Sequence, residues 1–236
     1  EYYREVLKKA AKYHLTVNFH EPIKATGERR TYPNMMAREG ARGQEYNAWS
    51  EGNPPSHTAI LPFTRMLAGP MDFTPGVIDV LETKGFNKRR VHTTAAKQLA
   101  LYVVLFSPVQ MLADLPENYI GKPEFQFLAD VPTDWEDTKV LNAEIGEYIT
   151  TVRKDLKSDD WYLGSITNKK TRDFDIDLSF LGEGKYEAQI YADGKGVDIN
   201  HNPSTVTISK KEVQAKDTLK IHLGAGGGTA IRFKKL

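Results

Sequence analysis

The sequence predicts two parts of different fold class: half of a (β/α)8 TIM barrel, with a linker, over residues 1–132, and an antiparallel β-sandwich over residues 133–236. In the first part, short apolar segments run directly into charged and aromatic residues, which is typical of barrel strands at the end that carries the chemistry. In the second part, short β-rich segments recur between turn residues, and helix signals are scarce. The change falls within residues 116–136.

The first part alternates predicted strands with predicted helices, as expected for an α/β fold. Residues 1–13 have the spacing of an amphipathic helix. A helix is also predicted over residues 57–67, and a third over residues 93–106 with Thr93 or Thr94 as its N-cap. Strands are predicted at residues 15–19, 34–39, 71–73 and 109–113. Four such units make half of an eight-stranded barrel.

A long loop over residues 40–55 interrupts this pattern. Loops of this length within a compact domain are usually functional or disordered. The presence of Tyr46 and Trp49 favours an ordered, functional loop.

The second part contains eight predicted strands, which indicates a sandwich. They are residues 139–143, 148–154, 161–167, 173–180, 186–192, 205–209, 218–223 and 229–233. The glycine-rich residues 224–228 could suggest a phosphate-binding loop, but no helix and no Lys-Ser/Thr pair follows, so a tight hairpin is favoured. Asp173, Asp175 and Asp177 alternate with apolar residues and are predicted to form the solvent face of a strand.

The composition excludes several classes of function. With 32 Lys and Arg against 31 Asp and Glu, the chain has no long-range field for nucleic acid, and its longest apolar run, residues 99–106, is too short to enter a bilayer. Neither nucleic acid nor membrane insertion is therefore expected. The absence of cysteine excludes a disulfide scaffold, a zinc–thiolate site and a thiol nucleophile. The chain opens inside a helix, without Met or a signal peptide, so we expect a piece of a longer protein.

Three carboxylates stand out in the first part: Glu21, Glu39 and Glu45. Each comes near the end of a predicted buried strand, where barrel folds gather their reactive groups. Carboxylates brought together repel one another, and a hard divalent cation with oxygen ligands relieves that repulsion. Paired carboxylates also suit glycoside hydrolysis, in which one acts as acid and the other as base.

Several stretches resemble glycoside hydrolase family 97, the bacterial α-glucosidase and α-galactosidase family. These stretches are NFHEPIKATGERRTYPN, REGARGQEYNAW, HTAILPFTRMLAGPMDFTPG, AAKQLALYVVLFSPVQMLADLPENY and DDWYLGSIT. The resemblance runs through both parts of the chain. It implies a longer protein with an N-terminal β-supersandwich, a central barrel and a C-terminal sandwich. By this resemblance the chain is the C-terminal half of the (β/α)8 TIM barrel followed by the antiparallel β-sandwich, so the missing N-terminal part of the same protein is an expected partner.

The resemblance also implies roles for individual residues. Glu45 matches the general acid that protonates the departing glycosidic oxygen. Glu21 matches the general base of the inverting α-glucosidase branch, whereas the retaining α-galactosidase branch has glycine there. Glu39 resembles a ligand of a calcium ion that Glu21 and Glu45 also touch, and His20 resembles a residue that binds the sugar.

Tyr46 and Trp49 are candidates for stacking on a sugar ring, with loop packing as the equal alternative. The leading prediction is a calcium-dependent, inverting hydrolase of terminal α-glucosidic bonds in oligosaccharides, inactive as this piece alone and, by resemblance, periplasmic or otherwise extracytoplasmic in a bacterium. One alternative is a retaining α-galactosidase, whose nucleophile lies upstream of Glu1. The other is a non-catalytic carbohydrate-binding or structural piece.

Overall fold

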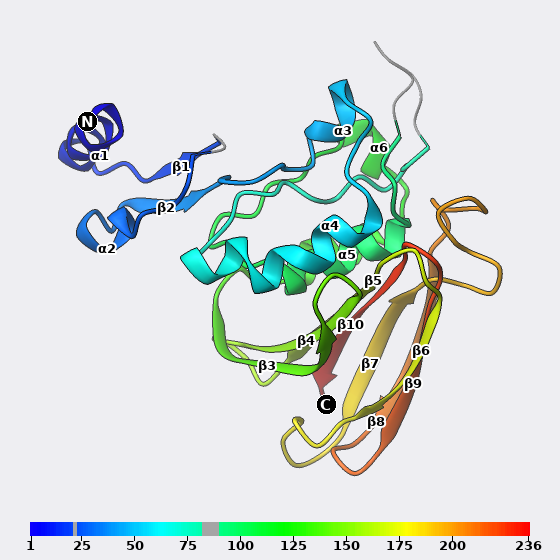
Figure 1. Cartoon of the computed structure of the whole chain (residues 1–236). Coiled ribbons are helices and arrows are strands. Elements are labelled where there is room, and N and C mark those ends of the chain that lie inside the picture. The colour runs from blue at the N-terminus through cyan, green and yellow to red at the C-terminus, as the bar shows by residue number, and fades with distance from the viewer. Residues whose placement is uncertain (21–22, 82–89) are drawn as a thin grey trace.

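The computed structural model describes residues 1–20, 23–81 and 90–236, and Figure 1 shows the order of its elements. The helices are α1 (Tyr2–Lys12), α2 (Glu28–Thr31), α3 (Tyr46–Trp49), α4 (Pro55–Ile60), the 3₁₀ turns η1 (Leu61–Phe63) and η2 (Arg65–Ala68), α5 (Ala95–Val104), α6 (Pro116–Tyr119) and α7 (Phe125–Asp130). The strands are β1 (Val17–Phe19), β2 (Met35–Arg38), β3 (Trp135–Glu144), β4 (Tyr148–Asp155), β5 (Trp161–Thr167), β6 (Arg172–Asp177), β7 (Tyr186–Ala192), β8 (Thr207–Val213), β9 (Thr218–Leu223) and β10 (Gly228–Lys235).

The second part is an antiparallel sandwich, and all eight predicted strands are confirmed. Six strands form one sheet in the order β3-β4-β5-β10-β7-β8, and β6 and β9 form a two-stranded sheet that packs on one of its faces. The alternation along β5 shows how the sequence builds this layer. Trp161 and Leu163 point into the core between the sheets, whereas Tyr162 and Ile166 point to the opposite face.

Helix α5 covers that opposite face of the large sheet. Every residue of α5 is buried, because the helix lies between β5 and β10 on one side and the first part of the chain on the other. Thr94 caps the helix as predicted, since its side chain accepts a hydrogen bond from the Lys97 backbone N–H. One continuous core therefore joins Met71 and Phe73 of the first part to the sandwich.

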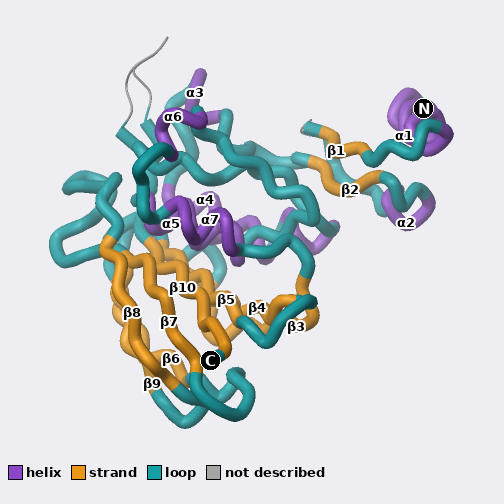
Figure 2. The backbone as a smooth tube through the Cα atoms, turned by 180° about the vertical axis from the view of Figure 1, so that it is seen from behind, coloured by secondary structure: helices purple, strands orange, loops and turns teal. Residues whose placement is uncertain are grey.

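The first part contains a short parallel sheet. β1 pairs with β2, and Met71 forms a single parallel bridge to Arg38 on the other edge of β2. In both views of the backbone, α1, α2 and the beginnings of β1 and β2 lie at one end, apart from the rest of the described chain (Figures 1 and 2). Parallel pairing brings the carboxyl ends of the three segments to one edge.

Two strand predictions in the first part need correction. The third predicted strand is reduced to the bridge at Met71, and residues 109–113 form no strand. Side chains, in place of a neighbouring strand, hydrogen-bond the backbone of this last segment. The Ser107 hydroxyl bonds both the N–H and the carbonyl of Val109, and the Tyr102 hydroxyl donates to the carbonyl of Met111. The structure thus shows the parallel, α/β character of this part but not four barrel strands.

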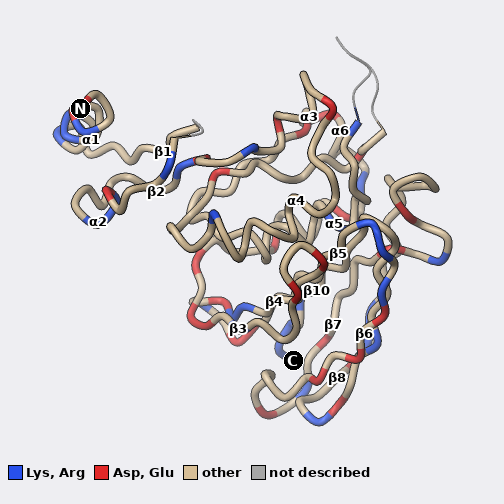
Figure 3. The backbone as a smooth tube through the Cα atoms, in the orientation of Figure 1, with Lys and Arg blue, Asp and Glu red and all other residues tan. Residues whose placement is uncertain are grey.

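Basic and acidic residues are interspersed along the sandwich strands, as Figure 3 shows for β6 and β8. Among the described residues, no helix has the length and apolar character needed to cross a membrane.

Candidate active site

Three side chains meet at the carboxyl-end edge of the parallel sheet. His20 follows β1, Glu39 follows β2, and Asp72 follows the bridge residue Met71. The backbone ladder continues through these positions, because the Glu39 N–H donates to Phe19 and the Asp72 N–H donates to Arg38. The predicted convergence of Glu39 with its neighbours at a sheet edge follows directly from this pairing.

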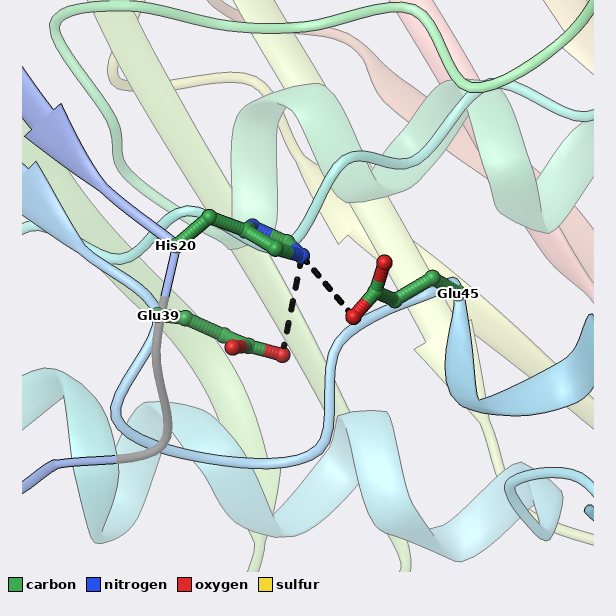
Figure 4. A group of neighbouring side chains, drawn as sticks. All are labelled: His20, Glu39 and Glu45. Carbon is green, nitrogen blue, oxygen red and sulfur yellow. Dashed lines mark ion pairs between the residues drawn. The ribbon is translucent and has the colours of Figure 1, made fainter. Parts of the chain in front are cut away.

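His20 lies at the centre of the cluster. Its Nδ1 atom is 3.0 Å from Asp72 Oδ2, and its Nε2 atom is 3.2 Å from Glu45 Oε1 and 3.8 Å from Glu39 Oε1. Figure 4 shows the side chains of Glu39 and Glu45 pointing toward the imidazole ring. His20, Glu39 and Glu45 come from three separate segments and face one another. Of the three carboxylates expected to converge, Glu39 and Glu45 lie together here, and Glu21 lies outside the described residues.

The charges of the cluster perturb its acid–base groups. Partial burial opposes protonation of His20, but the hydrogen bond to Asp72 and the charges of the three carboxylates outweigh it and raise the pKa of the imidazole. Burial raises the pKa of the Glu39 carboxyl, although the His20 charge and the Gly43 N–H partly offset this rise. Among the residues that the structure describes, His20 is the only basic group within ion-pair distance of Glu39 or Glu45.

Glu45 is held by the long loop. It directly precedes α3, and its side chain is 44% exposed, whereas the Glu39 side chain is 7% exposed. The two residues before Glu45 anchor the loop to the strand ends. The Gly43 N–H donates to Glu39 Oε1, and the Gln44 N–H donates to the carbonyl of Phe73. An accessible carboxyl group on an anchored loop is suited to exchange a proton with a bound ligand.

A cavity of about 550 Å³ opens in front of Glu45. Its polar lining consists mainly of Asn18, His20, Gln44, Glu45, Asn47 and Asp72. Asn18 Oδ1, Gln44 Nε2 and Asp72 Oδ1 are buried and make no hydrogen bond within the described part of the chain. Unpartnered donors and acceptors of this kind suit a ligand that carries several hydroxyl groups.

Tyr46 and Trp49 are not among the cavity-lining residues. The Arg42 guanidinium lies 4.8 Å from the centre of the Tyr46 ring, and Trp49 is 56% exposed. Their predicted stacking on a sugar stays a prediction. Glu21 lies outside the described residues, so the structure does not test its predicted role.

Sequence reasoning missed two residues that organise the site. Asp72 follows a predicted strand end just as Glu39 does, and that position could have identified it. Arg65 donates hydrogen bonds to the backbone carbonyls of Arg38, Glu39, Gly69 and Pro70, and so ties the end of β2 to the segment that leads into Asp72. No motif signals this role for Arg65.

The donor set is compatible with a hard cation. One side-chain donor atom from each of His20, Glu39 and Glu45 lies within 4.8 Å of the others. The two carboxylates suit Ca²⁺, which takes six to eight oxygen ligands. Within the described part of the chain, no Lys or Arg forms an ion pair with the buried Glu39 carboxylate. The imidazole nitrogen suits Ca²⁺ poorly, so the carboxylates are the fitting ligands.

Comparison with known proteins identifies the family. A model of glycoside hydrolase 97 matches residues 1–41, and a model of the glycosyl-hydrolase 97 C-terminal, oligomerisation domain matches residues 134–234. A retaining alpha-galactosidase from Bacteroides thetaiotaomicron is 38% identical over 232 residues, covering 95% of this chain and 34% of that protein. The chain belongs to glycoside hydrolase family 97. The resemblance seen in the sequence is thereby confirmed.

Other family 97 proteins align over nearly the whole chain. A family 97 enzyme from Pseudoalteromonas sp. strain K8, solved in complexes with panose and with acarbose, is 53% identical with a TM-score of 0.93, covering 99% of this chain and 37% of that one. A probable retaining alpha-galactosidase from Streptomyces bingchenggensis is 32% identical, covering 97% of this chain and 33% of that protein. The chain thus spans about a third of the length of these relatives. The curated names agree with the alternative prediction, a retaining α-galactosidase, better than with an inverting α-glucosidase.

Proposed function

We propose that this chain supplies the general-acid side of a glycoside hydrolase active site that cleaves α-linked sugars. The observation that carries the proposal is the convergence of Glu45, His20 and Glu39, of which Glu45 and His20 line the cavity. Glu45, the exposed member of the three, donates a proton to the glycosidic oxygen as the bond to the anomeric carbon breaks. The leaving group departs as a neutral alcohol, and the anomeric carbon gains the oxygen of a water molecule, directly on inversion or after a glycosyl-enzyme intermediate on retention. The Glu45 carboxylate recovers a proton from water.

His20 and Asp72 orient the site around that acid. Asp72 accepts a hydrogen bond from His20 Nδ1 and fixes the ring so that Nε2 faces Glu45. His20 also lines the cavity, where its imidazole can bond a sugar hydroxyl. Rigid placement of this kind lets the acid meet the glycosidic oxygen without reorganisation.

We also propose that the site binds Ca²⁺ through Glu39 and Glu45, with Glu21 as a further ligand. The ion would supply positive charge that offsets the repulsion among the carboxylates. Support comes from the two facing carboxylates and from the buried Glu39, whose pKa is raised by burial.

The substrate and stereochemistry have two candidate answers. The names of the curated relatives support a retaining α-galactosidase, whose nucleophile lies outside this chain. The panose and acarbose complexes of the 53% identical enzyme support hydrolysis of α-glucosides, and Glu21, at the position of a general base, supports inversion. In either case the other half of the site comes from the rest of the protein.

The experiment uses a family 97 protein of full length that contains this chain. Glu45→Gln is expected to lower kcat about 10²–10⁴-fold on substrates with poor leaving groups, the usual contribution of general acid catalysis. Glu51→Gln, in the same loop, is the matched control. Unchanged turnover by Glu45→Gln would contradict the proposal. NMR of the first-formed anomer, with paired α-glucoside and α-galactoside substrates, separates the two candidates.

A further inference from the structure

The sandwich meets the first part of the chain at a fully buried lysine. Lys97 lies on α5 with no exposed surface, and its Nζ atom donates to the carbonyl of Pro55 at 2.7 Å and to that of Thr167 at 2.8 Å. Pro55 is the first residue of α4, and Thr167 is the last residue of β5. One ammonium group therefore links the end of the long loop to the sandwich.

The glycine-rich turn between β9 and β10 completes this contact. The Thr94 N–H donates to the Gly226 carbonyl, and the Thr167 N–H donates to that of Gly227. A Cβ atom on Gly227 would overlap the Asp193 carboxylate, and one on Gly228 would lie 2.8 Å from the Cα of Lys97. The segment is a tight turn between two strands, as predicted, but it is not a hairpin: β9 pairs with β6 and β10 with β5 and β7, so the turn crosses from one sheet to the other. Its lack of side chains lets the sandwich approach α5 closely.

Buried hydrogen bonds join the segment just before Pro55 to the residues on either side of Glu45. Asn53 donates through its side chain to the Gly43 carbonyl and through its backbone to Asn47 Oδ1, and Asn47 donates to the Gln44 carbonyl. Asn47 and Asn53 are only 6% and 5% exposed. The loop over residues 40–55 is thus one internally bonded unit, with Glu45 within it and Lys97 at its end.

We propose that Lys97 is a positioning residue for the catalytic acid: by holding Pro55 and Thr167 together, it makes the sandwich a support for the loop that carries Glu45. This inference rests on the acid role proposed for Glu45. It gives the sandwich a part in catalysis that is distinct from oligomerisation. Buried, well-bonded networks of this kind rigidify the groups they join.

The test compares two substrates of the same sugar in the full-length enzyme. A glycosyl fluoride needs little protonation of its leaving group, whereas an alkyl or oligosaccharide glycoside depends on the acid. Lys97→Met is expected to lower kcat on the poor leaving group at least about tenfold more than on the fluoride, because small displacements of a reacting group are costly. Glu45→Gln serves as the reference, and Lys211→Met on the exposed strand β8 is the matched control.

The outcomes separate the two proposals. If Glu45→Gln slows both substrates equally, the acid role fails, and this inference fails with it. If Glu45→Gln is selective but Lys97→Met slows both substrates equally or neither, only the positioning role is overturned.

Should Lys97→Met not fold, Gly227→Ala replaces it, with Gly182→Ala as the control. The added methyl group of Gly182→Ala would meet only the Tyr186 hydroxyl at 3.2 Å. Gly227→Ala is expected to show the same selective loss on the poor leaving group, and an equal effect on both substrates overturns the inference.

Discussion

The Oδ2 atom of Asp72 lies 3.0 Å from Nδ1 of His20, across 52 residues of sequence. Asp72 is only 3% exposed, whereas the His20 side chain is 33% exposed and faces the cavity. The buried carboxylate therefore fixes a ring whose other nitrogen is turned toward Glu45. This contact makes Asp72 the residue that sets the orientation of the cluster.

Replacement of Asp72 tests that role. Asp72→Asn is expected to lower kcat/KM of the full-length enzyme about 10–100-fold, the range typical of partners that orient a functional histidine. The loss follows because the amide removes the charge that holds the Nδ1 proton. The check is steady-state kinetics, with Asp159→Asn on the exposed surface as control. A loss below about twofold, within the error of such a control, would contradict the assignment.

Arg65 is expected to support the site through the backbone. Its guanidinium reaches four carbonyl oxygens in a planar fork, which a lysine ammonium cannot reproduce. Arg65→Lys is therefore expected to lower the free energy of unfolding by about 2–3 kcal/mol, since carbonyl groups are left without donors. Urea denaturation measures this, with Arg30→Lys on exposed α2 as control. Equal midpoints for the two variants would disprove the clamp.

Chelation tests the proposed calcium site. EDTA is expected to abolish most activity of the full-length enzyme, and added Ca²⁺ to restore it, because the acids then lose the charge that offsets their repulsion. Glu39→Gln is expected to raise the Ca²⁺ concentration needed for half-maximal activity at least about tenfold, since ligand charge sets affinity. Glu51→Gln is the control. Full activity in EDTA would remove calcium from the proposal.

The sandwich could be predicted from the sequence because its strands are β-rich segments with turn residues next to them. β5 and β7 begin and end where the apolar segments and turn residues indicate. Residues 109–113 have a similar apolar character, but the hydroxyl groups of Ser107 and Tyr102 hydrogen-bond their backbone where a strand would bond a neighbouring strand. Composition alone cannot reveal which backbone carbonyl the hydroxyl of a tyrosine elsewhere in the chain will hydrogen-bond.

The site was predictable where it depends on strand ends and not where it depends on tertiary contacts. His20 and Glu39 follow strands, and parallel strands share an edge, so their meeting could be foreseen. The contacts of Lys97 with Pro55 and Thr167 join residues 42 and 70 positions apart, and nothing near Lys97 in the sequence marks it as buried. Helical spacing places a lysine on α5 without saying that both faces of the helix are covered.

The burial of Lys97 predicts an unusual dependence of stability on pH. Burial lowers the pKa of Lys97 to about 7, although the charge of Asp193 partly opposes this, whereas a lysine in the unfolded chain has a pKa of 10.5. Between those values the unfolded chain binds more protons than the folded one, so stability rises with pH across this window. The rise is at most about 1.4 kcal/mol per pH unit.

Lys97→Met is expected to remove this rise between about pH 7 and 10, whereas Lys211→Met retains it. Asp193 and His57, which lie near Lys97, titrate below pH 7. The pKa of Asp193 is raised to about 6, mainly by burial, and burial lowers the pKa of His57. Urea unfolding at fixed ionic strength, followed in steps from pH 7 to 9, measures the slope. An identical slope in wild type and Lys97→Met would show that Lys97 keeps an ordinary pKa in the folded protein.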